Sequence, residues 1–392
     1  IKIFQLEFSW HKKRSRKMLL RLLFLSICVH YAASNFLSVA GRNFMFAGQH
    51  VHLSGANLAW YRYAWDFGNN EYSVSGPVLE QWVREISAAG GNCLRVWIHI
   101  EAEHTPEFDG NGFVVAPDRL GTIINDLRRF LQVAADNNVF VIPVLWNGAL
   151  MRNQRYRNLV LDDARLASYI DNALIPMVRA LSDMRALASW EIMNEPEGSV
   201  QIAPDPNPCF ATNNLQNTGA GWTGVNIPMF RFLRFINRQA GAIRRTDTKA
   251  LVSTGSWSEN SRTDVFANTR NYYTDSCLIQ AGGDQLGVLS FDQIHTYSWE
   301  GRWNNGSPFR HHSNVFNLNK PLVIGEFSSA CSENEGVDAL WNHSYNNGYA
   351  GTWSWQYNAG GHCSDTAAQQ RQGMTRIRHY THNGRIAVNI NA

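Results

Sequence analysis

Short apolar runs alternate with longer segments of helical period along most of the chain. Eight runs are almost continuously apolar, as expected for strands covered on both faces. They span residues 51–58, 93–100, 139–147, 187–194, 250–257, 288–297, 321–328 and 350–357. Between them, apolar residues recur three or four positions apart, as in amphipathic helices. The clearest of these segments are 76–91, 118–138, 163–183 and 227–247. Strands that alternate with helices predict a parallel sheet.

Eight such units suit a closed (β/α)8 barrel, the TIM-barrel class of α/β fold, formed as a single domain. A doubly wound open sheet is the alternative, but no Gly-x-Gly-x-x-Gly motif follows the first strand. The stretch "VAGRNFMFAGQH" at 39–50 precedes that strand and predicts a short hairpin that closes the floor of the barrel.

Residues 1–34 have a different pattern. A basic run at 12–17 is followed by Met18, an apolar stretch at 19–31 and the small residues 32–34. This is the order of regions in a secretory signal peptide, and the apolar stretch is shorter than the ~20 residues of a membrane span. We therefore expect upstream residues and a signal peptide in 1–34, with translation starting at Met18, and a single domain in 35–392. A basic tail that binds nucleic acid is the alternative.

Removing the leader changes the charge and the cysteine count. Residues 1–34 hold seven of the 35 Lys and Arg residues and one of the 32 acidic residues, so the formal charge of +3 becomes −3. The remaining chain therefore gives no electrostatic indication of a nucleic-acid partner. Five Cys residues follow position 34, and an odd number leaves one thiol free in an oxidising compartment. Cys93, in an apolar strand, is expected to be the free one.

Polar residues concentrate where the predicted strands end, which is where barrel enzymes carry their reactive groups. Glu326 follows the apolar run "PLVIG", and structure alone hardly explains it because charged residues are seldom buried unless paired. Arg95 as part of a structural ion pair and His295 as a core histidine remain alternatives. The strand-end set comprises Asn57, Arg95, His99, Asn194, Glu195, His295, Tyr297 and Glu326.

Glu195 and Glu326 supply two carboxyl groups at the ends of different strands. Such a pair suits glycoside hydrolysis, in which one gives a proton to the leaving oxygen and the other attacks the anomeric carbon or activates water. Arg95 would lower the pKa of the carboxyl that it touches, which favours the nucleophile. The 14 Trp residues suit sugar binding, because exposed indole faces stack on sugar rings; the candidates are Trp60, Trp146, Trp257, Trp353 and Trp355.

Five motifs, in chain order "RVWIH", "WEIMNEPEG", "DQIHTYSW", "LVIGEFS" and "GTWSWQYN", resemble glycoside hydrolase family five, a family of retaining (β/α)8 enzymes. The similarity runs from about residue 37 to at least 365. The longer strings "LASWEIMNEPEGSV" and "GTWSWQYNAGGHCSD" resemble the secreted β-1,4-mannanases of molluscs and other invertebrates.

The resemblance implies a role for each matching residue. Glu195 would be the general acid/base, Glu326 the nucleophile, and Asn194 a partner of the sugar 2-hydroxyl. Arg95 and Tyr297 would hold Glu326, His295 would support Glu195, and either Trp353 or Trp355 would lie under the reacting sugar. Many members have a His at the end of strand three, where this chain has Trp146 and Asn147, so that role is not assigned; His99 is expected nearby. Glu191, four residues before Glu195, is expected in a structural ion pair or hydrogen bond.

The implied function is that of a secreted, monomeric endo-β-1,4-mannanase that acts on digestive or environmental mannan. It needs no metal or other cofactor and has no nucleic-acid or membrane partner. Residues 35–392 then form the catalytic domain, and the retaining mechanism predicts carboxyl groups about 5–5.5 Å apart. Disulfides Cys331–Cys363 and Cys209–Cys277 are expected. An endo-β-1,4-glucanase of the same family and a carbohydrate-binding protein without catalysis are the alternatives.

Overall fold

The computed structural model describes residues 35–299, 301–358 and 360–391. The predicted signal peptide in residues 1–34 lies outside the described residues. Within the described ranges, no helix has both the length and the apolar character needed to cross a membrane.

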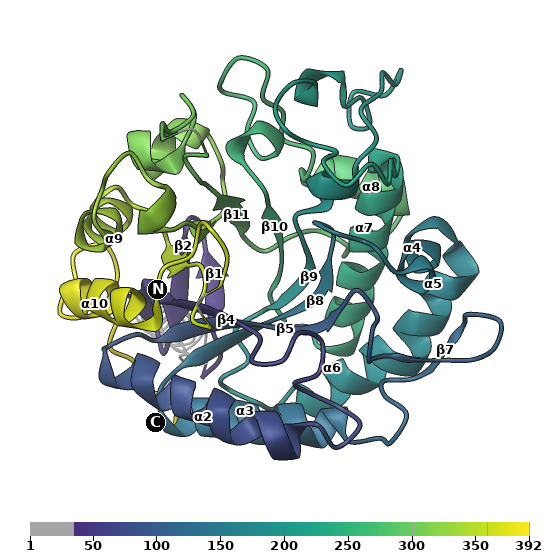
Figure 1. The fold of residues 1–392 in the computed structure, drawn as a ribbon, viewed down its shortest axis with the longest axis horizontal. Helices are drawn as coiled ribbons and strands as arrows, with labels where there is room; N and C mark the ends of the chain where they lie inside the picture. Colours follow the sequence, from purple (N-terminus) through teal and green to yellow (C-terminus); the bar gives the residue numbers. More distant parts are fainter. Residues whose placement is uncertain (1–34, 300, 359, 392) are drawn as a thin grey trace, which may run out of the picture.

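Eight parallel strands close into a barrel, which confirms the predicted (β/α)8 fold (Figure 1). Each strand pairs with the next one along the chain, and the last pairs with the first. Every residue in these strands is buried, which explains why their sequences are almost continuously apolar. They are β4 (Leu53–Ala59), β5 (Cys93–Ile100), β8 (Phe140–Asn147), β9 (Trp190–Asn194), β10 (Val252–Ser256), β11 (Asp292–His295), β12 (Leu322–Glu326) and β13 (Gly351–Ser354).

Helices form the outer layer of the barrel (Figure 1). They are α2 (Tyr72–Ala88), α3 (Ile123–Asp136), α4 (Gln154–Leu161), α5 (Asp163–Tyr169), α6 (Ile175–Leu181), α7 (Met229–Thr246), α8 (Asp275–Gly282), α9 (Val337–Asn346) and α10 (Ala367–Ile377). The predicted helix 163–183 forms α5 and α6 with a π-helical turn, η2 (Ile170–Leu174), between them. Pro176 follows this turn and has no amide hydrogen for the carbonyl four residues earlier, so the helix cannot continue regularly there.

The sixth unit of the barrel departs from the regular pattern. In the described part of the connection between β11 and β12, the only helical segments near the sheet are the 3-10 turns η6 (Pro308–Arg310) and η7 (Ser313–Phe316). The sequence there, "GRWNNGSPFRHHSNVFNLNKP", is rich in Gly, Asn and Pro and has no apolar stripe that could cover the barrel as a helix.

A three-stranded antiparallel sheet covers the amino-terminal end of the barrel. It consists of β1 (Ser38–Ala40), β2 (Asn43–Phe46) and β3 (Gln49–Val51), so the predicted hairpin at the floor is two hairpins that share β2. Phe44 packs against Phe291, just before β11, with ring centroids 5.1 Å apart. The floor is therefore closed, and the carboxyl ends of the strands remain for the site. A further small hairpin, β6 (Glu107–Phe108) and β7 (Val114–Ala116), lies between β5 and α3.

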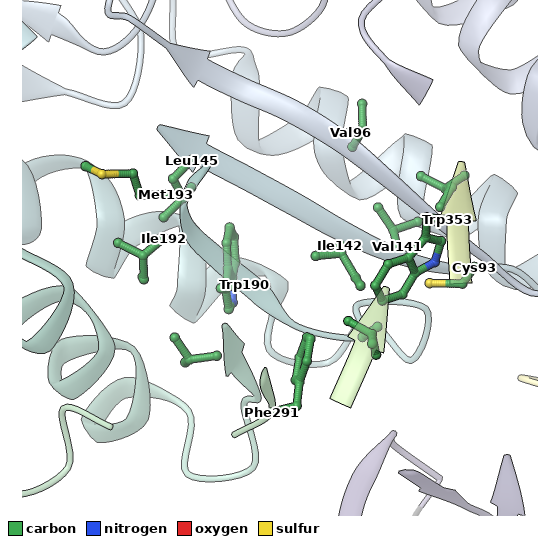
Figure 2. Packing of buried hydrophobic residues seen from close by; sticks show 14 of the residues in the cluster. Cys93, Val96, Val141, Ile142, Leu145, Trp190, Ile192, Met193, Phe291 and Trp353 are labelled. Atoms are coloured by element: carbon green, nitrogen blue, oxygen red, sulfur yellow. The ribbon is translucent and has the colours of Figure 1, made fainter. Parts of the chain in front are cut away.

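Buried apolar side chains pack around the barrel strands, and among them Trp353 lies beside Cys93 (Figure 2). Gly55 on β4 makes room for them: a Cβ at this position would lie 1.8 Å from the carbonyl oxygen of Cys93 and 3.1 Å from the Trp353 ring. Cys93 is a free, buried thiol, as predicted, and its burial raises the pKa of that thiol.

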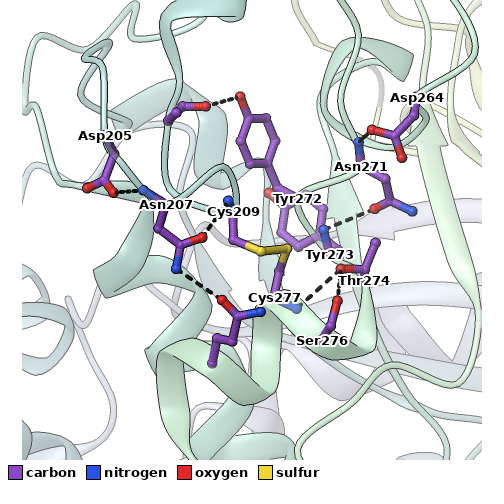
Figure 3. Close-up of a disulfide and its surroundings, with 12 residues drawn as sticks. Asp205, Asn207, Cys209, Asp264, Asn271, Tyr272, Tyr273, Thr274, Ser276 and Cys277 are labelled. Atoms are coloured by element: carbon purple, nitrogen blue, oxygen red, sulfur yellow. Dashed lines mark hydrogen bonds between the residues drawn. A yellow bond between two sulfur atoms is a disulfide. The ribbon is translucent and has the colours of Figure 1, made fainter.

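Both predicted disulfides are confirmed. Cys209–Cys277 joins the long loop after β9 to the first turn of α8 (Figure 3). Cys331–Cys363 joins the loops that follow β12 and β13. Because parallel barrel strands end at the same rim, both bridges lie among the loops that surround the mouth of the barrel.

Candidate active site

Glu195 and Glu326 meet at the mouth of the barrel. Glu326 is the last residue of β12, and Glu195 directly follows β9. Glu195 has left-handed backbone angles (φ 43°, ψ 62°), which are uncommon for a residue with a side chain, and its amide donates to the carbonyl of Gly255 at 2.9 Å. Pro196 then begins the 3-10 turn η3 (Pro196–Ser199). One carboxyl oxygen of each Glu lies within 4.8 Å of the other.

Arg95 binds Glu326 and the buried residues below the two carboxyl groups. All five of its N–H groups donate: two to Glu191 (2.8 and 2.5 Å), two from Nη1 to Asn57 (2.9 Å) and Glu326 (2.6 Å), and one to Asn194 (2.8 Å). The guanidinium group is completely buried. Glu191 therefore forms the deeper ion pair that its position in the strand predicts, and Arg95 contacts Glu326 as expected.

The carboxyl group of Glu326 is held from both sides. Its Oε1 accepts from Arg95, and its Oε2 accepts from the Tyr297 hydroxyl at 3.0 Å, with His295 Nδ1 3.5 Å away. Burial raises the pKa of this carboxyl, and the Arg95 guanidinium opposes the rise in the direction predicted from the sequence. The donors from Arg95 and Tyr297 favour the ionised form of Glu326.

The carboxyl group of Glu195 has a different environment. Its hydrogen-bond partner is His295, whose Nδ1 lies 2.8 Å from Oε1. Burial raises the pKa of Glu195 to about 8, the nearby Glu197 carboxylate adds to the rise, and Arg95 opposes it. Because the two carboxyl groups have such different partners, the pair can carry a single proton, and that proton resides on Glu195.

His295 lies between the catalytic carboxyl group of Glu195 and the buried Gln293 and Glu191 below it. Burial lowers its pKa to about 4, so the ring is neutral over the ordinary pH range. Gln293 Nε2 donates to Glu191 at 3.0 Å and faces His295 Nε2 at 3.5 Å. Since an amide nitrogen can only donate, Nε2 of the ring is the acceptor and Nδ1 carries the hydrogen that is donated to Glu195.

A cleft of about 340 Å³ lies over Glu195, Glu326, Asn194 and Tyr297. Its aromatic wall consists of Trp60, Trp97 and Trp355, whose ring centroids lie 5.2–5.7 Å apart. Indole rings of this kind offer an apolar surface to the faces of sugar rings.

The structure distinguishes Trp355 from Trp353. Trp355 lines the cleft, whereas Trp353 is completely buried within the barrel. Residues two apart share a strand face but differ by about 6.6 Å in height. Trp353 therefore belongs to the layer of side chains below the site, and the sequence-based candidacy of Trp353 as a sugar-stacking residue is corrected.

Trp146 and His99 also lie away from the cleft. The Trp146 ring is buried and stacks on Tyr156 (4.9 Å), and its indole N–H donates to Gln239 on α7 (3.1 Å). His99 packs on Trp146 and bonds Thr105. A register shift between Trp97 and Ile100 of β5 interrupts the alternation that would have placed His99 on the inner face. Neither side chain presents a surface to substrate.

A second cleft, also of about 340 Å³, adjoins the first and contains Trp257. The two clefts share Tyr297 and Trp299, and the Trp299 side chain is 64% exposed on the ridge between them. The open surface therefore continues from the two carboxyl groups toward Trp257.

Several contributors to the cleft were not predicted as site residues, among them Trp97, Trp299, Asn147 and Tyr63. Asn147 ends β8, and its Oδ1 accepts from Asn194 Nδ2 at 3.1 Å. Tyr63 follows β4 and donates its hydroxyl hydrogen to the buried Glu101 at 2.6 Å. Asn147 could have been found by its position at a strand end. Tyr63 lies in a loop, where the sequence has no comparable signal.

The loop 360–364 forms another part of the cleft wall. The Cys331–Cys363 bridge holds it, and so does the buried Asp365, which accepts from Ser329 and Ser354. His362 of this loop and the two sulfur atoms form one of two groups of possible metal ligands within the described residues, but those sulfurs are joined to each other. The other group is Glu195, His295 and Glu326, and hydrolysis by two carboxyl groups requires no metal.

No protein-family model matches the chain. It is 48% identical over 365 residues to a mannan endo-1,4-β-mannosidase of Cryptopygus antarcticus, a match that covers 92% of this chain and 95% of the relative. It is 44% identical over 322 residues to that of Mytilus edulis, covering 81% and 87%. The crystal structure of an Eisenia fetida endo-1,4-β-mannanase has a TM-score of 0.89 at 48% identity, covering 91% of this chain and 99% of that one. Such identity over nearly whole chains, with the same barrel, shows that this protein belongs to the invertebrate endo-1,4-β-mannanases of glycoside hydrolase family five.

Proposed function

We propose that the protein is a retaining endo-β-1,4-mannanase that cleaves internal bonds of mannan, glucomannan and galactomannan. The observation that carries this proposal is the placement of Glu195 and Glu326, with carboxyl oxygens within 4.8 Å of each other. Inverting enzymes need about 6.5–9.5 Å to admit a water molecule between substrate and base, whereas retaining enzymes need about 5–5.5 Å. The names of the related enzymes support mannan as the substrate.

In the first step, Glu195 gives its proton to the glycosidic oxygen while a carboxylate oxygen of Glu326 attacks the anomeric carbon. The carbon–oxygen bond to the leaving chain breaks, and a covalent glycosyl-enzyme forms on Glu326. Arg95 and Tyr297 hold Glu326 in place, and His295 orients Glu195. Asn194 is positioned by Arg95 and Asn147 to bond the sugar 2-hydroxyl.

In the second step, Glu195 is ionised and takes a proton from water, whose oxygen attacks the same anomeric carbon. The bond to Glu326 breaks, and Glu195 regains its proton. Two inversions at one carbon leave its configuration unchanged.

Hydrolysis of soluble β-mannan, followed by proton NMR, tests this proposal. The first reducing ends to form should have the β configuration, and the α form should appear later by mutarotation. Carboxymethylcellulose under the same conditions should release far less reducing sugar. Initial α product would overturn the retaining mechanism, a preference for the cellulose would favour an endo-β-1,4-glucanase, and no hydrolysis of either polymer would favour a binding protein.

The pKa of Glu195 predicts the upper limit of the pH range. The first step needs a proton on Glu195, and its pKa is raised to about 8. We therefore expect kcat/KM on mannan oligosaccharides to fall as the pH rises through about 8, roughly tenfold per unit beyond it. A pH–rate profile measures this. Because an activated aryl leaving group needs little protonation, the fall should be much weaker with an aryl mannoside.

Trp355→Ala should weaken the enzyme by removing a wall of the cleft. Loss of one aromatic contact surface, worth about 1.5–3 kcal/mol, predicts a fall in kcat/KM of roughly 10- to 150-fold. The matched variant Trp353→Phe should keep most of kcat/KM and instead lower the denaturant midpoint, because its ring lies in the barrel interior. The reverse result would exchange the two assignments.

Secretion and a monomeric state are further parts of the proposal. Two disulfides support folding in an oxidising compartment, in agreement with the signal-peptide pattern in residues 1–34. All groups assigned to the reaction come from one chain, so the site needs no second subunit.

A further inference from the structure

Glu197 is a completely buried carboxyl group beside the catalytic pair. It lies two residues after Glu195, in the turn η3 that directly follows the left-handed Glu195. Its Oε1 accepts from the Tyr273 hydroxyl at 2.5 Å, and its Oε2 accepts from the backbone amide of Trp257 at 3.3 Å. Donors to both oxygens favour a negative charge on Glu197.

Arg262, a cation that contacts the Tyr273 ring, is already paired with another group. The Arg262 guanidinium lies over the Tyr273 ring, 4.1 Å from its centroid, and pairs with Asp292. It also donates to Ser256 and to the carbonyl of Thr254. Among the described residues, no Lys, Arg or His lies within ion-pair distance of Glu197, so its charge acts on its surroundings without a counter-charge in contact.

The other charged groups near Glu195 come from four strands. β11 contributes His295, β12 contributes Glu326, β5 contributes Arg95 and β9 contributes Glu191, with the Tyr297 hydroxyl directed at Glu326. The single positive charge of Arg95 is divided between Glu191 and Glu326. After burial, Glu197 is the largest contributor to the raised pKa of Glu195.

We propose that Glu197 is a positioning residue whose buried negative charge keeps the proton on Glu195 before the first step and strengthens Glu195 as a base in the second. Both effects have one cause: a negative charge nearby destabilises the ionised form of Glu195 and so raises its proton affinity. The bond from the Trp257 amide joins this group to the wall of the second cleft. The inference rests on the acid/base role proposed for Glu195.

Glu197→Gln tests the charge at almost constant shape. A Gln side chain can still accept from the Trp257 amide, and its NH₂ can donate to the Tyr273 oxygen. In the full chain, the basic limb of the kcat/KM profile on mannan oligosaccharides should move down by about one pH unit or more, while the acidic limb stays in place. Glu197→Asp keeps the charge and should keep the limb near its native position.

Glu80→Gln is the matched control. Glu80 is also buried and also accepts from a tyrosine hydroxyl, that of Tyr72, but it lies on α2 in the outer layer. This variant should lose stability without a shift of the basic limb. A folded Glu197→Gln variant with an unmoved limb would overturn the proposal, as would a shift of equal size in Glu80→Gln.

A measurement on the native chain covers the case in which Glu197→Gln does not fold. Carbon-13 NMR of labelled glutamates should show that the Glu195 carboxyl still holds its proton at pH 6; an ionised Glu195 at that pH would overturn the inference. Failure of the acid/base role itself has a different signature: Glu195→Gln would retain native activity on mannan.

Discussion

Glu326→Ala is expected to abolish turnover of mannan. The variant lacks the oxygen that attacks the anomeric carbon, and loss of a covalent nucleophile can reduce kcat on the order of 10⁶-fold. The remaining site, with Glu195 still bonded to His295, should bind mannan oligosaccharides with little change in affinity. Reducing-sugar release and isothermal titration calorimetry measure the two quantities.

Azide separates loss of the nucleophile from loss of the fold in this variant. The small anion can enter the space left by the side chain and attack the anomeric carbon of an aryl mannoside from the same face as Glu326. An α-configured mannosyl azide should therefore form in Glu326→Ala and be absent in the native enzyme. Appreciable mannan hydrolysis by Glu326→Ala, without azide, would contradict the assignment of the nucleophile.

Arg95→Met is expected to cause the largest loss of stability at the site, together with loss of activity. The substitution removes five hydrogen bonds and leaves Glu191 buried without its cation. Breaking a buried pair by removing one partner costs about 3–5 kcal/mol. Denaturant unfolding should show this decrease in the free energy of unfolding, and kcat should fall because Glu326 loses a donor that holds it.

The double variant Arg95→Met/Glu191→Gln distinguishes the two consequences. Removing the Glu191 charge should restore part of the stability, because the unpaired buried charge causes most of the cost. It should restore none of the activity, because Glu326 and Asn194 still lack Arg95. A double variant no more stable than Arg95→Met would show that Glu191 is not the main source of the loss.

Much of the site follows from two regularities of the sequence. Strands covered on both faces read as apolar runs, and the first polar residues after such runs lie at the mouth of a barrel. These regularities located Glu195, Glu326, His295 and Asn194, which the structure brings together.

The same regularities failed where the backbone departs from ideal alternation. A register shift in β5 turns His99 outward, and Trp146 lies on the opposite face of β8 from Asn147. Glu197 was missed for another reason: it lies in a turn, where neither period nor strand end marks a buried position.

By itself, the sequence determined the barrel, the order of its strands, the two carboxyl groups and the free Cys93, because burial on both faces and the chemistry of strand ends are local properties of the chain. Only the tertiary structure decided that Trp355 and not Trp353 reaches the cleft, that Arg95 divides its charge between two acids, and that Glu197 adds a third carboxylate beside them. These outcomes depend on depth within the barrel and on distances between strands far apart in sequence, which no local pattern encodes.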